Sequence, residues 1–248
     1  MTDLTGKTAL ITGGGGGVGA ALALAFAEAG ARVWISGRSE DRLQEVAARH
    51  GKISAVVADV TNEASVQAMF ATSGPADIVI ANAGASQSAT FVKTDLASWH
   101  DMIGVNLTGV FLTFREGLRQ MPGSGGRLIA IASTAGLKGY GYVAPYAAAK
   151  HGVVGMVRSL ALEVAKTDVT VNAICPGFLN TEMTDRSVAN IMDKTGMDVD
   201  KARAALAGHN PQGRLIEPGE VADTALWLCA QGAASINGQA IAISGGEI

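Results

Sequence analysis

Residues 7–30 read KTALITGGGGGVGAALALAFAEAG, a short β-type run, five consecutive glycines and an apolar helical pattern that ends at Gly30. A strand, a glycine-rich turn and a helix in this order are the setting in which glycines indicate dinucleotide binding, because backbone N–H groups can then approach a pyrophosphate. The N-terminus of the helix adds partial positive charge at the same place. The stretch predicts the first strand–helix unit of a nucleotide-binding fold.

The glycine run fits two spacings at once. One is the general dinucleotide fingerprint, Gly14-x-Gly16-x-x-Gly19, and the other is a variant, Thr12-Gly13-x-x-x-Gly17-x-Gly19. The sequence does not choose between them, and glycine runs also occur in plain flexible loops. The flanking strand and helix favour nucleotide binding.

The rest of the chain continues the alternation of strands and helices. Further β-type runs are expected at 31–36, 53–58, 77–81, 126–132, 170–175 and 239–244, and helical patterns at 96–106, 108–120, 147–165 and 218–230, with another helix from about residue 63. This order predicts an α/β fold of one domain spanning residues 1–248, a Rossmann-type doubly wound parallel sheet of about seven strands with helices on both faces. Ligands of such sheets bind at the carboxyl ends of the strands.

Composition excludes several classes of protein. The net charge is −3 and no cluster of Lys or Arg occurs, so we expect no nucleic-acid partner. No apolar run reaches about 18 residues and no signal peptide is visible, so we expect no membrane segment. Two distant cysteines, Cys175 and Cys229, fit a reducing, cytoplasmic compartment. The four histidines show no metal-ligand spacing with either cysteine, so we expect no metal.

Tyr146 and Lys150 stand four residues apart after Pro145, which suits the first turn of a helix. A tyrosine titrates near ~10 in water, and bringing its pKa to about 7 requires roughly 4 kcal/mol of phenolate stabilisation. One ammonium group at about 4 Å and an effective dielectric constant of ~20 supplies roughly that amount. The pair could therefore act as an acid/base, although the same spacing occurs by chance in many helices.

The end of the second expected strand bears on the choice of cofactor. An acidic residue there accepts the ribose 2′-OH of NAD, whereas an arginine accommodates the 2′-phosphate of NADP. This chain has Gly37 and Arg38, and Ser39 is expected to cap a helix whose first turn holds Glu40 and Asp41. The pattern favours NADP, with NAD possible; the alternative is an ordinary surface arginine.

The motifs together resemble the classical short-chain dehydrogenase/reductase family over essentially the whole chain. The matching elements, in the family's order, are Thr12-Gly13-x-x-x-Gly17-x-Gly19, Asp59, Asn82-Ala83-Gly84, Asn106, Ser133, Tyr146-x-x-x-Lys150 and Pro176-Gly177. Two positions depart from the family's pattern. Gly16 stands where many NADP-using relatives have a basic residue, and Ala81-Asn82 replaces the usual pair of asparagines.

The resemblance implies a catalytic tetrad of Asn106, Ser133, Tyr146 and Lys150. Tyr146 would transfer the proton to or from the carbonyl oxygen, and Ser133 would hydrogen-bond the same oxygen. Lys150 would lower the pKa of Tyr146 and hold the nicotinamide ribose, while Asn106 would hold a water that links Lys150 to solvent. Without the Tyr146–Lys150 pair, Ser133 and Asn106 would be interpreted as backbone-capping residues.

The resemblance also implies the cofactor contacts. Asp59 would accept the adenine amino group, Asn82 would line the adenosine ribose, and Leu179 and Thr181 would contact the nicotinamide amide. The full expected set is Thr12, Gly13, Gly16, Gly17, Val18, Gly19, Arg38, Ser39, Asp59, Val60, Asn82, Ala83, Gly84, Tyr146, Lys150, Pro176, Gly177, Leu179 and Thr181.

For the substrate, segments around Ser133, Tyr146 and Pro176 resemble the branch that reduces β-ketoacyl thioesters carried on CoA or a carrier protein. The alternatives are a dehydrogenase of free cyclic, aromatic, steroid or sugar alcohols and a non-catalytic NADP sensor, which would not need both Tyr146 and Lys150. The family resemblance implies a homotetramer. Residues 179–210 lack a strand pattern and contain several methionines, which predicts a mobile lid over the substrate.

Overall fold

The computed structural model describes residues 2–121 and 125–248 and contains one seven-stranded parallel sheet with the strand order β3-β2-β1-β4-β5-β6-β7. The strands are β1 (Thr8–Thr12), β2 (Arg32–Gly37), β3 (Ile53–Val57), β4 (Ile78–Ala81), β5 (Gly126–Ile131), β6 (Val169–Pro176) and β7 (Ala240–Ile243). Each expected β-type run forms one of them, so the predicted fold class is confirmed. The strand order reverses between β1 and β4, which is where ligands of doubly wound sheets bind.

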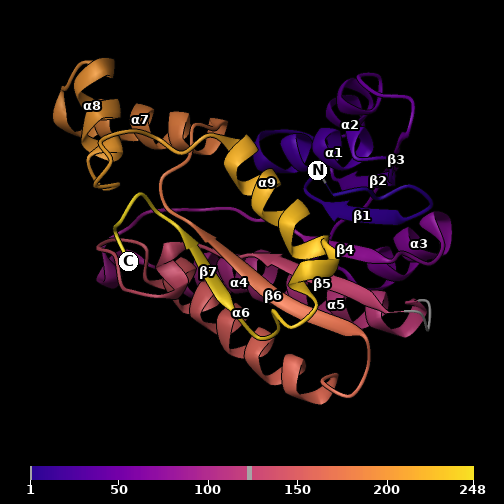
Figure 1. Cartoon of the computed structure of the whole chain (residues 1–248). Helices are drawn as coiled ribbons and strands as arrows, with labels where there is room; N and C mark the ends of the chain where they lie inside the picture. Colours follow the sequence, from indigo (N-terminus) through magenta and orange to yellow (C-terminus); the bar gives the residue numbers. More distant parts are fainter. Residues whose placement is uncertain (1, 122–124) are drawn as a thin grey trace.

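Helices cover both faces of the sheet (Figure 1). The α-helices are α1 (Gly17–Glu28), α2 (Glu40–Ala47), α3 (Glu63–Ser73), α4 (Leu96–Ile103), α5 (Gly109–Gln120), α6 (Ala144–Glu163), α7 (Glu182–Thr195), α8 (Val199–Ala207) and α9 (Pro218–Cys229). Short 3-10 turns are η1 (Phe91–Lys93), η3 (Thr134–Gly136) and η4 (Gln231–Ala233), and η2 (Gly104–Thr108) is a π-helical segment between α4 and α5.

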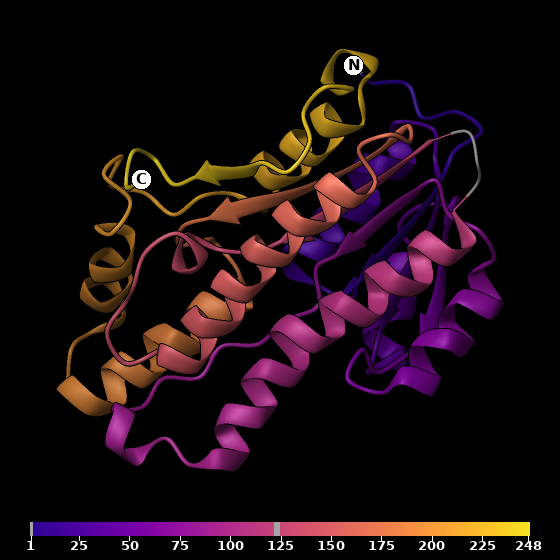
Figure 2. The ribbon, with the colours of Figure 1, turned by 90° about the horizontal axis from the view of Figure 1, so that it is seen from below.

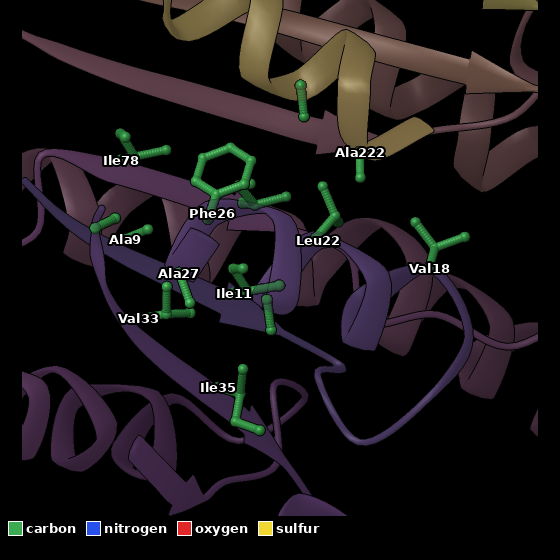
Figure 3. Close-up of a cluster of buried hydrophobic side chains, with 14 of the residues drawn as sticks. Ala9, Ile11, Val18, Leu22, Phe26, Ala27, Val33, Ile35, Ile78 and Ala222 are labelled. Atoms are coloured by element: carbon green, nitrogen blue, oxygen red, sulfur yellow. The ribbon is translucent and has the colours of Figure 1, made fainter. Parts of the chain in front are cut away.

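The core consists of two apolar layers separated by the sheet. Side chains that alternate along the strands point to opposite faces, so Ile11 of β1 packs in one layer and Leu10 in the other. The first layer lies under α1, α2 and α9 and includes Leu22 and Phe26 of α1, which Figure 3 shows above β1 and β2. The second layer lies under α3, α5 and α6. With both faces buried, the strands are nearly continuous apolar runs.

The stretch between β6 and α9, for which the sequence predicts no strand, forms the helices α7 and α8. The two helices pack on each other through a small cluster of their own, Val188, Ala202 and Leu206. They lie at the end of the molecule toward which the arrowheads of β6 and β7 point (Figure 2). Among the residues that the structure describes, no helix is both long and apolar enough to cross a membrane.

Candidate active site at the carboxyl edge of the sheet

The loop between β1 and α1 follows the second of the two possible glycine spacings. Gly13 and Gly17 both have positive φ, at 68° and 51°, a region that favours glycine. A Cβ atom on Gly19 would lie 2.1 Å from the carbonyl oxygen of Gly13, so α1 can approach the end of β1 this closely only with glycine at position 19. The structure therefore assigns the spacing Thr12-Gly13-x-x-x-Gly17-x-Gly19.

Side chains from β1 and from the residues after β4 fix the loop in place. The Thr12 hydroxyl accepts hydrogen bonds from the backbone N–H groups of Asn82 and Ala83, at 3.0 and 3.1 Å. The Asn82 amide in turn donates to the carbonyl oxygens of Thr12 and Gly13, at 2.9 and 3.1 Å. Asn82 thus fixes the loop through its amide donors, and its expected place along the adenosine ribose stays a prediction.

This loop fits the pyrophosphate of a dinucleotide. It is bare of side chains from Gly13 to Gly17, and Gly16 occupies the N-cap position of α1, where first-turn N–H groups have no partner within the helix. Those groups and the helix dipole suit an anion. Val18 is buried in the core beneath the loop, so it can contribute to the site through its backbone only.

The expected adenosine end lies at the carboxyl ends of β2 and β3. Arg38 is exposed, and within the described residues it has no hydrogen bond or ion pair. Ser39 occupies the N-cap position of α2 as predicted, but its hydroxyl makes no capping hydrogen bond. The Asp59 carboxylate accepts two hydrogen bonds from Thr61, which together with the nearby Arg38 hold its pKa below the usual value. The side chain of Val60 is buried.

Tyr146, Lys150 and Ser133 meet where α6 crosses the ends of β5 and β6. Pro145 stands in the first turn of α6, as the sequence predicts, and Tyr146 and Lys150 share one face of the helix. The Lys150 ammonium lies 5.5 Å from the centre of the Tyr146 ring and donates to the Ile131 carbonyl oxygen at 2.9 Å. Ser133 follows β5, and its hydroxyl lies near enough to the Tyr146 hydroxyl to influence its pKa. Residues from two elements thus converge on one phenol.

Burial dominates the protonation of these groups in the unliganded protein. Burial raises the pKa of Tyr146, and the hydrogen bond with Ser133 offsets part of that rise. The pKa of Lys150 is lowered to about 8, because its ammonium group is almost fully enclosed. The pKa of Tyr146 is thus raised by burial rather than lowered by Lys150 as expected, and the Lys150 ammonium lies beside the ring, bonded to a backbone carbonyl.

Asn106 is fully buried in the π-helical segment η2 and close to Lys150. A Cβ atom on Gly84 would lie 2.9 Å from Asn106 Oδ1 and 3.8 Å from Lys150 Nζ, so the two side chains flank the same glycine. The Asn106 amide donates to the carbonyl oxygens of Ala85 and Met102, at 2.9 and 3.0 Å. Because the Asn106 amide N–H groups already donate to backbone carbonyls, a water between Asn106 and Lys150 could bond to Asn106 only through its acceptor oxygen, Oδ1.

The residues after β6 connect the sheet to α7. Pro176 ends β6, and the Gly177 N–H donates to the Ile243 carbonyl oxygen of β7 at 2.8 Å. Leu179 forms an isolated bridge with Ile216, and Thr181 occupies the N-cap position of α7. A Cβ atom on Gly17 would lie 3.5 Å from the Thr181 methyl group. The glycine loop and the segment after β6, both expected to bind the cofactor, are therefore in contact.

A ring cluster beside the tetrad has no counterpart in the sequence-based expectations. Tyr140 and Phe178 meet edge to face with centroids 6.2 Å apart, and Phe178 stacks on His209 at 4.9 Å. The Tyr140 hydroxyl hydrogen-bonds Thr134, next to Ser133, at 2.6 Å. We call Tyr140, Phe178 and His209 the aromatic wall. Its members come from three distant segments, so no local signal could have brought them together.

The comparisons with known proteins agree with this geometry. Residues 7–191 match the family described as short chain dehydrogenase. The chain is 34% identical to a 3-oxoacyl-[acyl-carrier-protein] reductase of Aquifex aeolicus, with 98% of each chain covered. It is 35% identical to a D-beta-hydroxybutyrate dehydrogenase of Cupriavidus necator, with 99% of each covered. A crystal structure of an actinorhodin polyketide ketoreductase variant with NADPH matches with a TM-score of 0.92 and 32% identity, covering 100% of this chain and 99% of that one.

Proposed function

Because this chain belongs to the short-chain dehydrogenase family, we propose that it is an NADP(H)-dependent oxidoreductase that interconverts 3-oxoacyl and 3-hydroxyacyl thioesters. The observation that carries the reaction class is the convergence of Ser133, Tyr146 and Lys150 beside a loop that fits a dinucleotide. The thioester substrate and NADP are supported by relatives named as acyl-carrier-protein and polyketide ketoreductases.

The proposed roles follow from where the side chains lie. The nicotinamide supplies or accepts the hydride when the dinucleotide is bound. Tyr146 gives its proton to the carbonyl oxygen during reduction, and Ser133, whose hydroxyl lies near that of Tyr146, positions the same oxygen. Lys150 holds the nicotinamide ribose with its ammonium group. Asn106 positions the loop after β4 against Lys150 through its bonds to Ala85.

The raised pKa of Tyr146 gives the two directions of the reaction different pH dependences. The phenol remains protonated at neutral pH, which is the form that reduction needs, whereas oxidation needs the phenolate. Oxidation rates should therefore rise from about pH 7 toward about pH 10, while reduction is fastest near neutrality and falls as the phenol ionises. Profiles of kcat/KM against pH in both directions measure this, and an oxidation rate that is flat over the range would contradict the assignment.

The direct test is a steady-state assay of the purified protein at the nicotinamide absorbance. Acetoacetyl-CoA and an acyl-carrier-protein thioester are compared with simple cyclic and aromatic ketones, each with NADPH and with NADH. We expect the thioesters to be reduced with the highest kcat/KM and with NADPH preferred. Binding of NADPH without turnover of any ketone would instead indicate the sensor.

A second substrate class is favoured by the aromatic wall. Tyr140, Phe178 and His209 pack on one another, the Tyr140 hydroxyl bonds to Thr134 next to Ser133, and flat rings stack well on aromatic surfaces. Free cyclic or aromatic secondary alcohols are therefore the alternative substrates. Higher kcat/KM for an aromatic ketone than for acetoacetyl-CoA would select this alternative.

We further propose that residues 179–210 act as a lid and that the protein is a cytoplasmic homotetramer. The lid is supported by the position of α7 and α8 beyond the strand ends and by their separate small core. Exposed Phe111 of α5 and Leu162 of α6 support self-association, because burial against another copy removes them from water. The two free cysteines suit a reducing compartment. Light scattering of the eluting protein measures the oligomeric state.

A further inference from the structure

The glycine loop lacks a cationic residue of its own, yet a guanidinium group lies against it. A Cβ atom on Gly16 would lie 2.7 Å from Nη2 of Arg42, and one on Gly15 would lie 3.3 Å from the Arg42 Cβ. Arg42 belongs to the first turns of α2, and its guanidinium group lies against the loop while the side chain stays about half exposed. The charge that Gly16 cannot provide is therefore present at the same place, supplied from another helix.

The Arg42 side chain is held there by a carboxylate from the far side of the loop. Nη2 of Arg42 donates to both carboxylate oxygens of Glu182, at 2.5 and 2.6 Å. Glu182 is the first residue of α7, directly after Thr181. The ion pair thus joins α2 at the adenosine end to the first turn of the proposed lid, and both side chains remain about half exposed.

Arg38 directly follows β2 and Arg42 belongs to α2, so the two cations come from neighbouring segments at the expected adenosine end. Arg38 lies near Asp59, which is expected to bind the adenine, and Arg42 lies over Gly15 and Gly16, where the pyrophosphate is expected. A doubly charged phosphate between them would be a stronger partner for the Arg42 guanidinium than one exposed carboxylate, because its three oxygens match the forked donors.

We propose that Arg42 is the second cation of the 2′-phosphate site and that Glu182 competes with the phosphate for it. The inference rests on the proposed use of NADP. Binding of NADPH exchanges the Arg42–Glu182 ion pair for an Arg42–phosphate pair, whereas NADH, which has a hydroxyl at this position, leaves the ion pair intact. Arg42 therefore determines specificity, and Glu182 lowers the affinity for the phosphorylated cofactor.

The test measures cofactor binding to the whole, substrate-free protein, by calorimetric titration with NADPH and with NADH. The variants are Arg42→Ala, Glu182→Gln, the double variant and, as a matched control, Arg49→Ala. Arg49 lines the same hollow of about 570 Å³ as Arg42 and Glu182, but it follows the end of α2. Thermal melting of each variant shows whether it is folded.

Each of the four variants has its own expected result. Arg42→Ala weakens NADPH binding about tenfold or more and changes NADH binding less than about twofold, because only a charge-assisted bond to the 2′-phosphate is lost. Glu182→Gln tightens NADPH binding about two- to fivefold, the range that an exposed ion pair allows. The double variant binds NADPH like Arg42→Ala, because Glu182 acts through Arg42, and Arg49→Ala behaves like wild type.

Other results overturn the proposal. Equal weakening of NADPH and NADH by Arg42→Ala would place Arg42 on the pyrophosphate or in a structural role. Unchanged or weaker NADPH binding by Glu182→Gln, or the same tightening when Arg42 is absent, would exclude the competition. A wild-type protein that prefers NADH would overturn the proposed cofactor itself, which distinguishes that failure from a failure of the Arg42 assignment.

Discussion

The tetrad region and the lid region are built in opposite ways. Lys150 and Asn106 are almost completely enclosed, and their polar atoms bond to backbone carbonyls of β5, of α4 and of the loop after β4. The helices α7 and α8 share a core of three buried side chains and are tied to the rest mainly by exposed ion pairs and hydrogen bonds, such as Arg42–Glu182 and Asn190–Ser88. The proposed catalytic residues thus lie in a tightly packed part of the fold, and the proposed lid is a weakly held one.

The sharpest test of the rigid region is Tyr146→Phe. The variant keeps the ring and removes only the hydroxyl, so we expect kcat to fall by about 10²–10⁴-fold while the Kd of NADPH changes little. Single-turnover kinetics and cofactor titration separate the two quantities. More than a few per cent of residual activity would remove Tyr146 from its assigned role.

Lys150→Ala should affect two properties at once. The proposed role of Lys150 is to hold the nicotinamide ribose beside Tyr146, so its loss should raise the Kd of NADPH about tenfold or more and, by misplacing the nicotinamide, lower kcat about 10²-fold. His151→Ala is the matched control, because His151 is the adjacent residue and, within residues 2–121 and 125–248, its side chain bonds only to the Ala147 carbonyl oxygen of its own helix. Unchanged cofactor affinity in Lys150→Ala would contradict the ribose contact.

Arg38→Ala tests whether this exposed arginine determines the preference for NADPH over NADH. A charge-assisted bond to the 2′-phosphate is worth roughly 1.5–3 kcal/mol, so the preference for NADPH over NADH in kcat/KM should drop about ten- to a hundredfold. Arg32→Ala provides a control, since Arg32 stands at the opposite end of β2. If the ratio is the same in Arg38→Ala as in wild type, Arg38 is an ordinary surface residue.

The smallest expected effects are on stability, and they come from making the same Val→Ala substitution in each of the two regions. Val154→Ala removes two methyl groups from the core under α6, and Val188→Ala removes the same groups from the cluster of α7 and α8. We expect Val154→Ala to lower the free energy of unfolding by about 1–3 kcal/mol. Val188→Ala should leave the global transition nearly unchanged and speed hydrogen exchange in residues 179–210 alone.

Hydrogen exchange measured with and without ligand tests the proposed lid, residues 179–210, in a second way. Exchange across α7 and α8 should slow on adding NADPH together with a substrate analogue, and exchange in β5 and β6 should not change. Equal protection of α7 and α8 with and without ligand would show that this region is a static insertion rather than a lid.

Local patterns were sufficient to predict the sheet and the position of the site. A strand that ends in glycine, serine or proline is recognisable within ten residues, and parallel topology then brings all such ends to one edge. The contacts that could not be predicted join distant segments. Arg42 and Glu182 are 140 positions apart. The π-helical segment at Asn106 was expected to be the end of one helix and the start of another, because a single added residue leaves the apolar pattern nearly unaltered.

The position of Cys175 in β6 has a practical consequence. Its thiol is fully buried near Tyr146 and Lys150, and burial raises its pKa to about 11, so almost no reactive thiolate exists at neutral pH. A thiol-specific dye should therefore label it only in molecules whose central strands have opened. The rate at which Cys175 is labelled therefore measures the rate at which the sheet unfolds, and no probe residue has to be introduced into the protein.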